Sequence, residues 1–287
     1  MTACLAVKIF LSHEKTLTLD RRRSAPVSRK MRLMENVLEF DLLERDGSTS
    51  RKSVNVKRLF LGRNTSRDIA GTKKNLDSLR GDGYSVHGNP NTCRKSRYLL
   101  TNEEVIEVQG PQTSGEVEYV AIFEGGEVFV SVGSDHNDRT LQYISNESLG
   151  KVFDSAKTKQ MCPAVVARTA WRYSDVKDHW DDLNLKSFIT VYGSKLPYQD
   201  FKLSNLVDLE YHLRNNSSLR DDGTVLFGGS SEMLSNVPST IYTGQSMIKG
   251  VTFPTDFNME LGDPVIGRKI SHSYSISVLE EIGSLSL

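Results

Sequence analysis

The sequence has few cysteines, no net charge and no long apolar run. Cys4, Cys93 and Cys162 are its three cysteines in 287 residues, and they are widely spaced. They make neither a disulfide framework nor a CxxC metal site, which indicates a reducing compartment. Lys and Arg together number 36, as do Asp and Glu, and this balance argues against a general polyanion binder. No apolar stretch approaches the ~18 residues of a membrane span, so we expect a cytoplasmic protein that binds neither nucleic acid nor membrane.

Several short signatures of known chemistry are missing as well. The sequence contains no GxxxxGK[ST] phosphate loop, no GxGxxG fingerprint, no HExxH zinc motif, no GxSxG elbow and no RNP-type motif. It has no internal repeat. Candidate functional residues must therefore be identified from their spacing along the expected strands and helices.

Length and composition suit one large globular domain with appendages. The chain is 38% hydrophobic and 25% charged, as in ordinary soluble proteins. Residues 1–36 stand apart, because a basic run follows Asp20 without another acid before Glu35. We interpret them as a basic, disordered extension, and a mitochondrial or other organellar targeting segment is the alternative. The remainder divides into an N-terminal strand and helix region, 37–110, and a main domain, 111–283.

Runs of apolar, β-branched and aromatic residues, some of them alternating with polar residues, predict a protein made mostly of strands. The pattern predicts strands at 37–43, 53–61, 117–123, 128–132, 188–192, 224–227 and 270–279. Helical spacing predicts helices at 65–80, with Ser66 as N-cap, at 170–183, and after Ser204 as N-cap. Together these elements indicate a β-rich α+β domain.

Three carboxylates are expected to meet on one predicted hairpin. Glu116 and Glu118 are two residues apart on its first strand, and side chains two apart share a face. A two-glycine turn of the kind that closes a hairpin follows. Pairing across this turn places Gly133 of the return strand opposite Glu118 and Asp135 opposite Glu116.

Such an acidic cluster requires a cation or a shared proton. Like charges ~4 Å apart repel by several kcal/mol at an intermediate dielectric. Three oxygen donors without Cys or His suit a hard divalent ion, Mg²⁺ or Mn²⁺, that keeps open positions for water and substrate. The alternative is an exposed hairpin face whose acids are simply solvated, since a register slip of one residue disperses the set.

The residues around this hairpin resemble the signature of the fumarylacetoacetate hydrolase-like proteins. Glu116-Val117-Glu118 followed by Asp135 and Arg139 is similar to the family pattern E-x-E … N-D-x-x-x-R-D-x-Q. Further matches follow in chain order: Gln142, Lys159 before Cys162-Pro163, Tyr198-Gln199, Leu226 to Ser230, and Leu261-Gly262-Asp263. The string G-S-D-H-x-D-R is more closely similar to domain-of-unknown-function family 2848, which the chain resembles from about Leu38 to Leu279.

The resemblance implies a fold, a metal and a catalytic lysine. The fold is the mixed β-sandwich roll of the fumarylacetoacetate hydrolase type, usually a homodimer. Glu116, Glu118 and Asp135 match the residues that hold Mg²⁺, Mn²⁺ or Ca²⁺ in that family. Lys159 matches a lysine that neutralises or polarises a substrate oxygen.

The resemblance also implies roles for residues around the pocket. Arg139, Gln199 and Ser230 match positions that brace the acidic patch or bind substrate. The family's catalytic histidine and its His-x-x-Glu pair have no match upstream of the hairpin. His87 and His136 are the histidines near in sequence, and His136 is the candidate catalytic residue.

These expectations make a metal-dependent enzyme the first hypothesis. We expect a hydrolase or decarboxylase acting on a small 2-oxo acid or 1,3-dicarbonyl acid through a metal-stabilised enolate. Tautomerisation fits the same machinery. The alternative hypothesis is a catalytically silent protein that binds a metal or ligand on the same fold, which the missing His-x-x-Glu pair favours.

Overall fold

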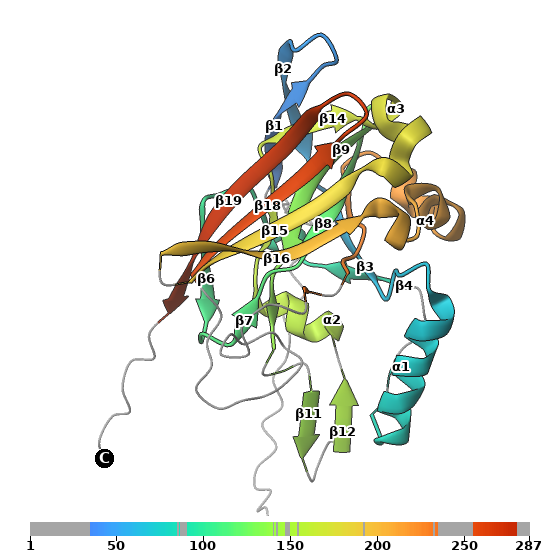
Figure 1. Ribbon diagram of the computed structural model, residues 1–287, viewed down its shortest axis with the longest axis vertical. Coiled ribbons are helices and arrows are strands. Elements are labelled where there is room, and N and C mark those ends of the chain that lie inside the picture. The colour runs from blue at the N-terminus through green and yellow to red at the C-terminus, as the bar shows by residue number, and fades with distance from the viewer. Residues whose placement is uncertain are drawn as a thin grey trace, which may run out of the picture. The chain divides into compact units, whose positions relative to one another are not determined.

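Figure 1 shows the computed structural model of the protein. The structure describes residues 35–84, 86, 91–139, 141, 143–146, 150–153, 155–191, 193–231, 233–234 and 255–279. For 143–146 and 150–153 it describes the backbone alone. Residues 1–34 of the expected extension, His87 and Gln142 lie outside the described residues.

Strands make up most of the described chain. They are β1 (Val37–Leu43), β2 (Thr49–Asn55), β3 (Arg58–Arg63), β4 (Asn91–Lys95), β5 (Leu100–Thr101), β6 (Val105–Gln109), β7 (Thr113–Ser114), β8 (Val117–Glu124), β9 (Glu127–Asp135), β10 (Asn137–Asp138), β11 (Tyr143–Asn146), β12 (Gly150–Phe153), β13 (Ala164–Val166), β14 (Thr169–Arg172), β15 (Asn184–Val191), β16 (Ser194–Lys202), β17 (Thr224–Phe227), β18 (Asp256–Asp263) and β19 (Arg268–Leu279). The α-helices are α1 (Ile69–Gly81), α2 (Ser155–Thr158), α3 (Tyr173–Val176) and α4 (Leu209–Asn215). Short 3₁₀ turns are η1 (Arg97–Leu99), η2 (Lys159–Met161), η3 (Lys177–Asp182), η4 (Leu203–Asn205) and η5 (Ser217–Arg220).

Two mixed sheets organise these strands. The main sheet has the order β2-β1-β14-β9-β8-β17-β3-β4, and β13 joins it at β9 with β5 beyond. The second sheet has the order β16-β15-β18-β19-β6, and its long strands pack against β8 and β9 (Figure 1). The main sheet thus draws strands from both sides of the residue-110 boundary. The expected β-rich α+β class, with mixed sheets and few helices, is confirmed.

Strand β8 is buried on both faces because it lies in the middle of the main sheet. Tyr119 and Ala121 point into the core between the two sheets, and Val120 and Ile122 point into a second core on the opposite face. The side chain of Glu118 belongs to the same face as Val120, two residues on. A carboxylate on this strand is therefore placed inside the protein.

The predicted helix at 170–183 is wrong in its first part. Residues 169–172 form β14, which lies between β1 and β9 and buries Trp171 completely. Helical structure begins only at Tyr173, in α3 and then η3. The backbone of this segment completes the main sheet, and this tertiary pairing overrides the helical spacing of its aromatic residues.

The two other predicted helices form, but with different N-caps. Asp68 rather than Ser66 caps α1, and Asp208 rather than Ser204 caps α4. In each case the aspartate accepts a hydrogen bond from the backbone N–H three residues on, the ordinary geometry of such a cap. None of the helices in the described part of the chain is long and apolar enough to cross a membrane.

Candidate active site

The register of the hairpin formed by β8 and β9 is the predicted one. Glu118 pairs with Gly133, and the backbone N–H of Asp135 donates to the carbonyl oxygen of Glu116 at 3.3 Å. Gly133 is needed here, because a Cβ at this position would lie 2.6 Å from the side chain of Val120. The pairing therefore brings Glu116, Glu118 and Asp135 to one face, as the spacing predicted.

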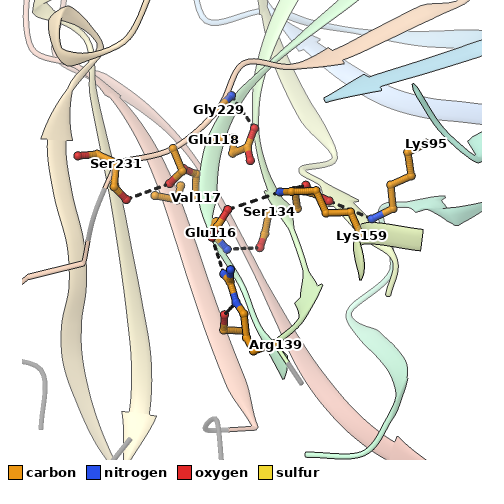
Figure 2. Close-up of polar contacts among 12 residues, drawn as sticks. Lys95, Glu116, Val117, Glu118, Ser134, Arg139, Lys159, Gly229 and Ser231 are labelled. Carbon is orange, nitrogen blue, oxygen red and sulfur yellow. Dashed lines mark hydrogen bonds and ion pairs between the residues drawn. The ribbon is translucent and has the colours of Figure 1, made fainter. Parts of the chain in front are cut away.

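Three cationic side chains bind Glu116 and Asp135 (Figure 2). Lys159 forms an ion pair with Asp135, and its Nζ lies 3.6 Å from Oε2 of Glu116. Lys95 Nζ donates to the other oxygen of Asp135 at 2.9 Å. Arg139 pairs with Glu116 and donates from Nε to the hydroxyl of Ser114 at 2.5 Å.

We call Glu116, Glu118, Asp135, Lys95, Lys159 and Arg139 the carboxylate–cation cluster. Three carboxyl groups and three cationic side chains form it, so its charge is zero only when every carboxyl group is ionised. The side chains of Lys95 and Asp135 are 0% exposed, whereas the side chain of Glu116 is 27% exposed. Solvent therefore reaches the cluster at Glu116, and a ligand would meet that carboxylate first.

The environment separates the acidities of the two glutamates. Burial raises the pKa of Glu116, but Arg139 and Lys159 outweigh burial and bring the pKa down to about 2. Burial raises the pKa of Glu118 well above its ordinary value, and the charges of Asp135 and Glu116 add to this rise, although Lys159 opposes it. Burial lowers the pKa of Lys159, yet the surrounding carboxylates reverse this and raise the pKa above its ordinary value. Lys159 is therefore an ammonium ion.

A glycine pair positions the second glutamate. The N–H of Gly229 donates to Oε2 of Glu118 at 2.6 Å, and Gly228 packs on the ring of Tyr119, where a Cβ would lie 1.9 Å from the ring. Gly229 has φ +97°, in the region that favours glycine. The backbone of this Gly-Gly-Ser segment therefore lies against the carboxylate of Glu118.

Gln199 and Ser230 bind this glycine segment to β8. The carboxamide oxygen of Gln199 accepts from the N–H of Val117 at 2.9 Å and from the hydroxyl of Ser187 at 3.0 Å. Its nitrogen donates to Ser230 at 2.8 Å and to the carbonyl of Ser231 at 2.7 Å. Since the four hydrogen-bonding positions of Gln199 are filled, the structure gives it a supporting position beside the cluster.

His136 points away from the carboxylates. Its Nδ1 lies 3.0 Å from the hydroxyl of Tyr274, and its Nε2 lies 2.8 Å from the hydroxyl of Thr113. Burial lowers the pKa of His136 to about 3, with the charges of Arg139 and Lys95 in the same direction. The ring is therefore neutral at physiological pH, and both nitrogens are engaged in holding neighbouring strands.

Lys95 is the member of the cluster that the sequence analysis missed. It ends β4, 40 residues before Asp135, and lies in the main sheet beside β3. A lysine that ends a strand is usually exposed, and no motif surrounds this one. The sequence does indicate that three converging acids need positive charge nearby, but this need does not identify which lysine or arginine supplies it.

The cluster fits a hard divalent ion in donor chemistry but not in its present spacing. Its carboxylate oxygens suit such an ion, and the ammonium of Lys159 already occupies a cation position between Asp135 and Glu116. Within the described ranges, however, no three His, Cys, Asp or Glu side chains are grouped so that they could hold an ion together. An ion could enter only by replacing contacts that Lys159 makes.

Solved structures share the fold at low sequence identity. The chain is similar to 2-keto-3-deoxyarabinonate dehydratase in a hexagonal crystal form, with TM-score 0.53, 12% identity, and coverage of 80% of this chain and 78% of that chain. The same dehydratase in complex with magnesium and 2,5-dioxopentanoate gives TM-score 0.51, 12% identity, and coverage of 80% and 77%. The protein Cg1458 gives TM-score 0.51, 14% identity, and coverage of 81% and 85%.

A fumarylacetoacetate hydrolase family protein from yeast is also among the matches, with TM-score 0.47, 12% identity, and coverage of 78% of this chain and 94% of that chain. The chain therefore shares the fold of the dehydratase and of Cg1458. A family model described as "Protein of unknown function (DUF2848)" matches residues 65–274. The chain belongs to this family, which confirms the closer resemblance. A comparison with curated protein sequences gives no match.

Proposed function

We propose that the protein is a divalent-metal-dependent hydrolase or decarboxylase for a small 2-oxo acid or 1,3-dicarbonyl acid. The observation that supports this function is the buried carboxylate–cation cluster, in which Lys159 lies between Asp135 and Glu116. A buried cluster of charges is unfavourable for stability unless it is fully paired. Its presence beside the partly exposed Glu116 therefore favours a functional role.

Glu116, Glu118 and Asp135 are the residues that would hold the ion. Once bound, Mg²⁺ or Mn²⁺ would supply a Lewis acid that stabilises the negative charge of an enolate. The complex of the related dehydratase with magnesium and 2,5-dioxopentanoate supports this proposal by similarity of fold. Ca²⁺ is the further candidate that the family resemblance leaves open.

The cationic side chains would act directly on the substrate or hold the ligands in place. Lys159 is an ammonium ion near the open side of the cluster, so it would donate a hydrogen bond to a substrate carboxylate or oxo oxygen. Arg139 keeps Glu116 ionised and in place through its ion pair. Gln199 and Ser230 keep Gly229 against Glu118. His136 has no proton-transfer role in this proposal, because both of its nitrogens are engaged.

Metal binding tests the site assignment. Millimolar Mg²⁺ or Mn²⁺ is expected to raise the melting temperature, because an ion that binds only the folded state stabilises it. Asp135→Asn should abolish this rise. Asp41→Asn is the matched control, since Asp41 is an exposed carboxylate of β1 that pairs with Arg51. An unshifted wild-type protein would show that the cluster is not a metal site.

Turnover tests the reaction. We expect a metal-supplemented screen of acylpyruvates and oxaloacetate to give activity that Glu118→Ala removes. If Glu118→Ala retained full activity on every acid that the wild-type protein turns over, the cluster would not be the active site. Assembly as a homodimer belongs to the same proposal, and light scattering of the purified protein checks it.

A catalytically silent binding protein is the second candidate. The observation in its favour is that His136, the histidine beside Asp135 in the sequence, is neutral and bonded at both nitrogens. In addition, Glu116 and Asp135 are already paired with cationic side chains without any ligand. Acids that raise the melting temperature but are never turned over would favour this candidate.

A further inference from the structure

Asn137 has a buried carboxamide with no hydrogen-bond partner among the residues that the structure describes. The residue is 1% exposed, and in this part of the chain neither Oδ1 nor Nδ2 has a partner. Buried polar groups in folded proteins are nearly always satisfied, and an exception requires an explanation such as a bound ligand or water. An asparagine can make up to four hydrogen bonds through this group, so its burial here is costly unless something binds to it.

The chain geometry directs Asn137 toward the carboxylate–cation cluster. Side chains two apart on an extended chain share a face, and Asp135 and Arg139, on either side of Asn137, both bind members of the cluster. Across the β7–β10 ladder, Asn137 pairs with Ser114, whose hydroxyl binds Arg139. Cross-strand partners also share a face, so both relations place the carboxamide on the cluster side.

The opposite face of the same segment is already accounted for. His136 binds Thr113 of β7, and Thr113 pairs with Asp138 across the ladder. His136 and Asp138 thus belong to one face and Asn137 to the other. Strand β10 also packs against η2, the turn that begins with Lys159. Asn137 therefore lies among the residues that we propose to bind substrate.

We propose that Asn137 contacts the substrate and selects acids that carry a hydroxyl group. Its Nδ2 would donate to a carboxylate or oxo oxygen, and its Oδ1 would accept from a hydroxyl. A carboxylate cannot satisfy Oδ1, because an ionised acid has no hydrogen to donate. A hydroxy-2-oxo acid offers both groups in one small molecule. This inference rests on the proposed function and adds a specificity-determining residue and a substrate class to it.

Pyruvate and 3-hydroxypyruvate are matched probes, because they differ by one hydroxyl group. In magnesium chloride, the wild-type protein is expected to bind 3-hydroxypyruvate roughly tenfold more tightly than pyruvate. This ratio of affinities corresponds to about one buried hydrogen bond. Asn137→Leu, of nearly the same shape, should bind the two acids equally. Titration of the melting temperature with each acid gives both affinities. Asn258→Leu, on β18, is the control and should keep the wild-type preference.

The ligand-free stability of Asn137→Leu is the second readout. If only a substrate satisfies the carboxamide, the ligand-free Asn137→Leu variant should have the melting temperature of the wild-type protein or a higher one, since an unsatisfied buried group has been removed. A fall in melting temperature with an unchanged preference would mean that a structural water occupies the position, and would overturn the inference. Asn137→Ser repeats the affinity comparison if the leucine variant does not fold.

The outcomes separate this inference from the proposed function. Equal binding of pyruvate and 3-hydroxypyruvate by the wild-type protein overturns the role of Asn137 and leaves the enzyme proposal in place. Failure of the wild-type protein to bind magnesium and either acid overturns the proposed function itself.

Discussion

The hairpin of β1 and β2 and the hairpin of β8 and β9 contain the same acidic spacing with opposite results. In the first, Glu39 and Asp41 are two residues apart and bind Arg51 at 2.9 Å and 3.0 Å. These three side chains are 49–56% exposed. In the second, Glu116 and Glu118 are two residues apart, but Glu116 binds the buried cations Arg139 and Lys159, and Glu118 accepts from the backbone N–H of Gly229. The spacing of acids on a strand therefore indicates a shared face and does not distinguish an exposed pair from a functional cluster.

Position in the sheet produces the difference. Strand β2 lies at the edge of the main sheet, whereas β8 and β9 lie in its middle with the second sheet packed against them. Water screens the charges of the first hairpin, so its ion pairs contribute little to stability. In the second, each charge must find a partner within the protein, and loss of one partner leaves another charge buried and unpaired.

Lys95→Met should give the largest effect, because it leaves one oxygen of Asp135 without its partner inside the protein. The expected loss of unfolding free energy is about 3–5 kcal/mol, measured by urea denaturation. Arg51→Met is the matched substitution in the exposed hairpin and should cost at most about 1 kcal/mol. Losses of equal size in the two variants would contradict the contrast between the hairpins.

Lowering the pH should reduce the unfolding free energy because of a buried histidine, His212, beside the glycine segment that holds Glu118. His212 lies against the backbone of Gly228, and burial lowers its pKa to about 4. The unfolded chain takes up a proton near pH 6.5 and the folded protein does not, so stability falls from that pH down to about 4. The loss amounts to about 3 kcal/mol. His212→Leu should remove this part of the pH dependence of unfolding, and an unchanged pH dependence would contradict the assignment.

Gly229→Ala should have a smaller effect. A Cβ at this position would lie 1.9 Å from the hydroxyl of Thr65, and the left-handed backbone adds strain, so the expected cost is about 1–3 kcal/mol. The variant should also weaken metal binding, since Gly229 positions Glu118. Gly47→Ala, in the turn between β1 and β2, is the control because it has φ +84° and open space around it. It should cost about 1 kcal/mol and leave metal binding unchanged.

The part of the fold that sequence predicts well is local. The β8–β9 hairpin follows from apolar, β-branched and aromatic residues on both sides of a two-glycine turn, and its register is observed as predicted. The start of the helix predicted at 170–183 was wrong, because the helical spacing of Tyr173 and Trp180 does not indicate where the helix begins. Residues 169–172 form a strand because β1 and β9 lie on either side of them and pair with their backbone.

The candidate site divides in the same way. Glu116, Glu118 and Asp135 could be found from one hairpin, because short-range pairing brings them together. Lys159 could be found only through family resemblance. Lys95 could not be found, since nothing near it in the chain indicates that β4 reaches Asp135.

The sequence by itself determined the strand-rich class, the register of the central hairpin and the convergence of its three acids, because these depend on neighbours along the chain. Only the tertiary structure decided how far each acid is buried, that three cations pair with Glu116 and Asp135, and that the buried carboxamide of Asn137 has no partner among the described residues. Burial and charge pairing depend on which distant strands cover a residue. The same two-residue spacing is therefore a solvated pair on β1 and a carboxylate–cation cluster on β8.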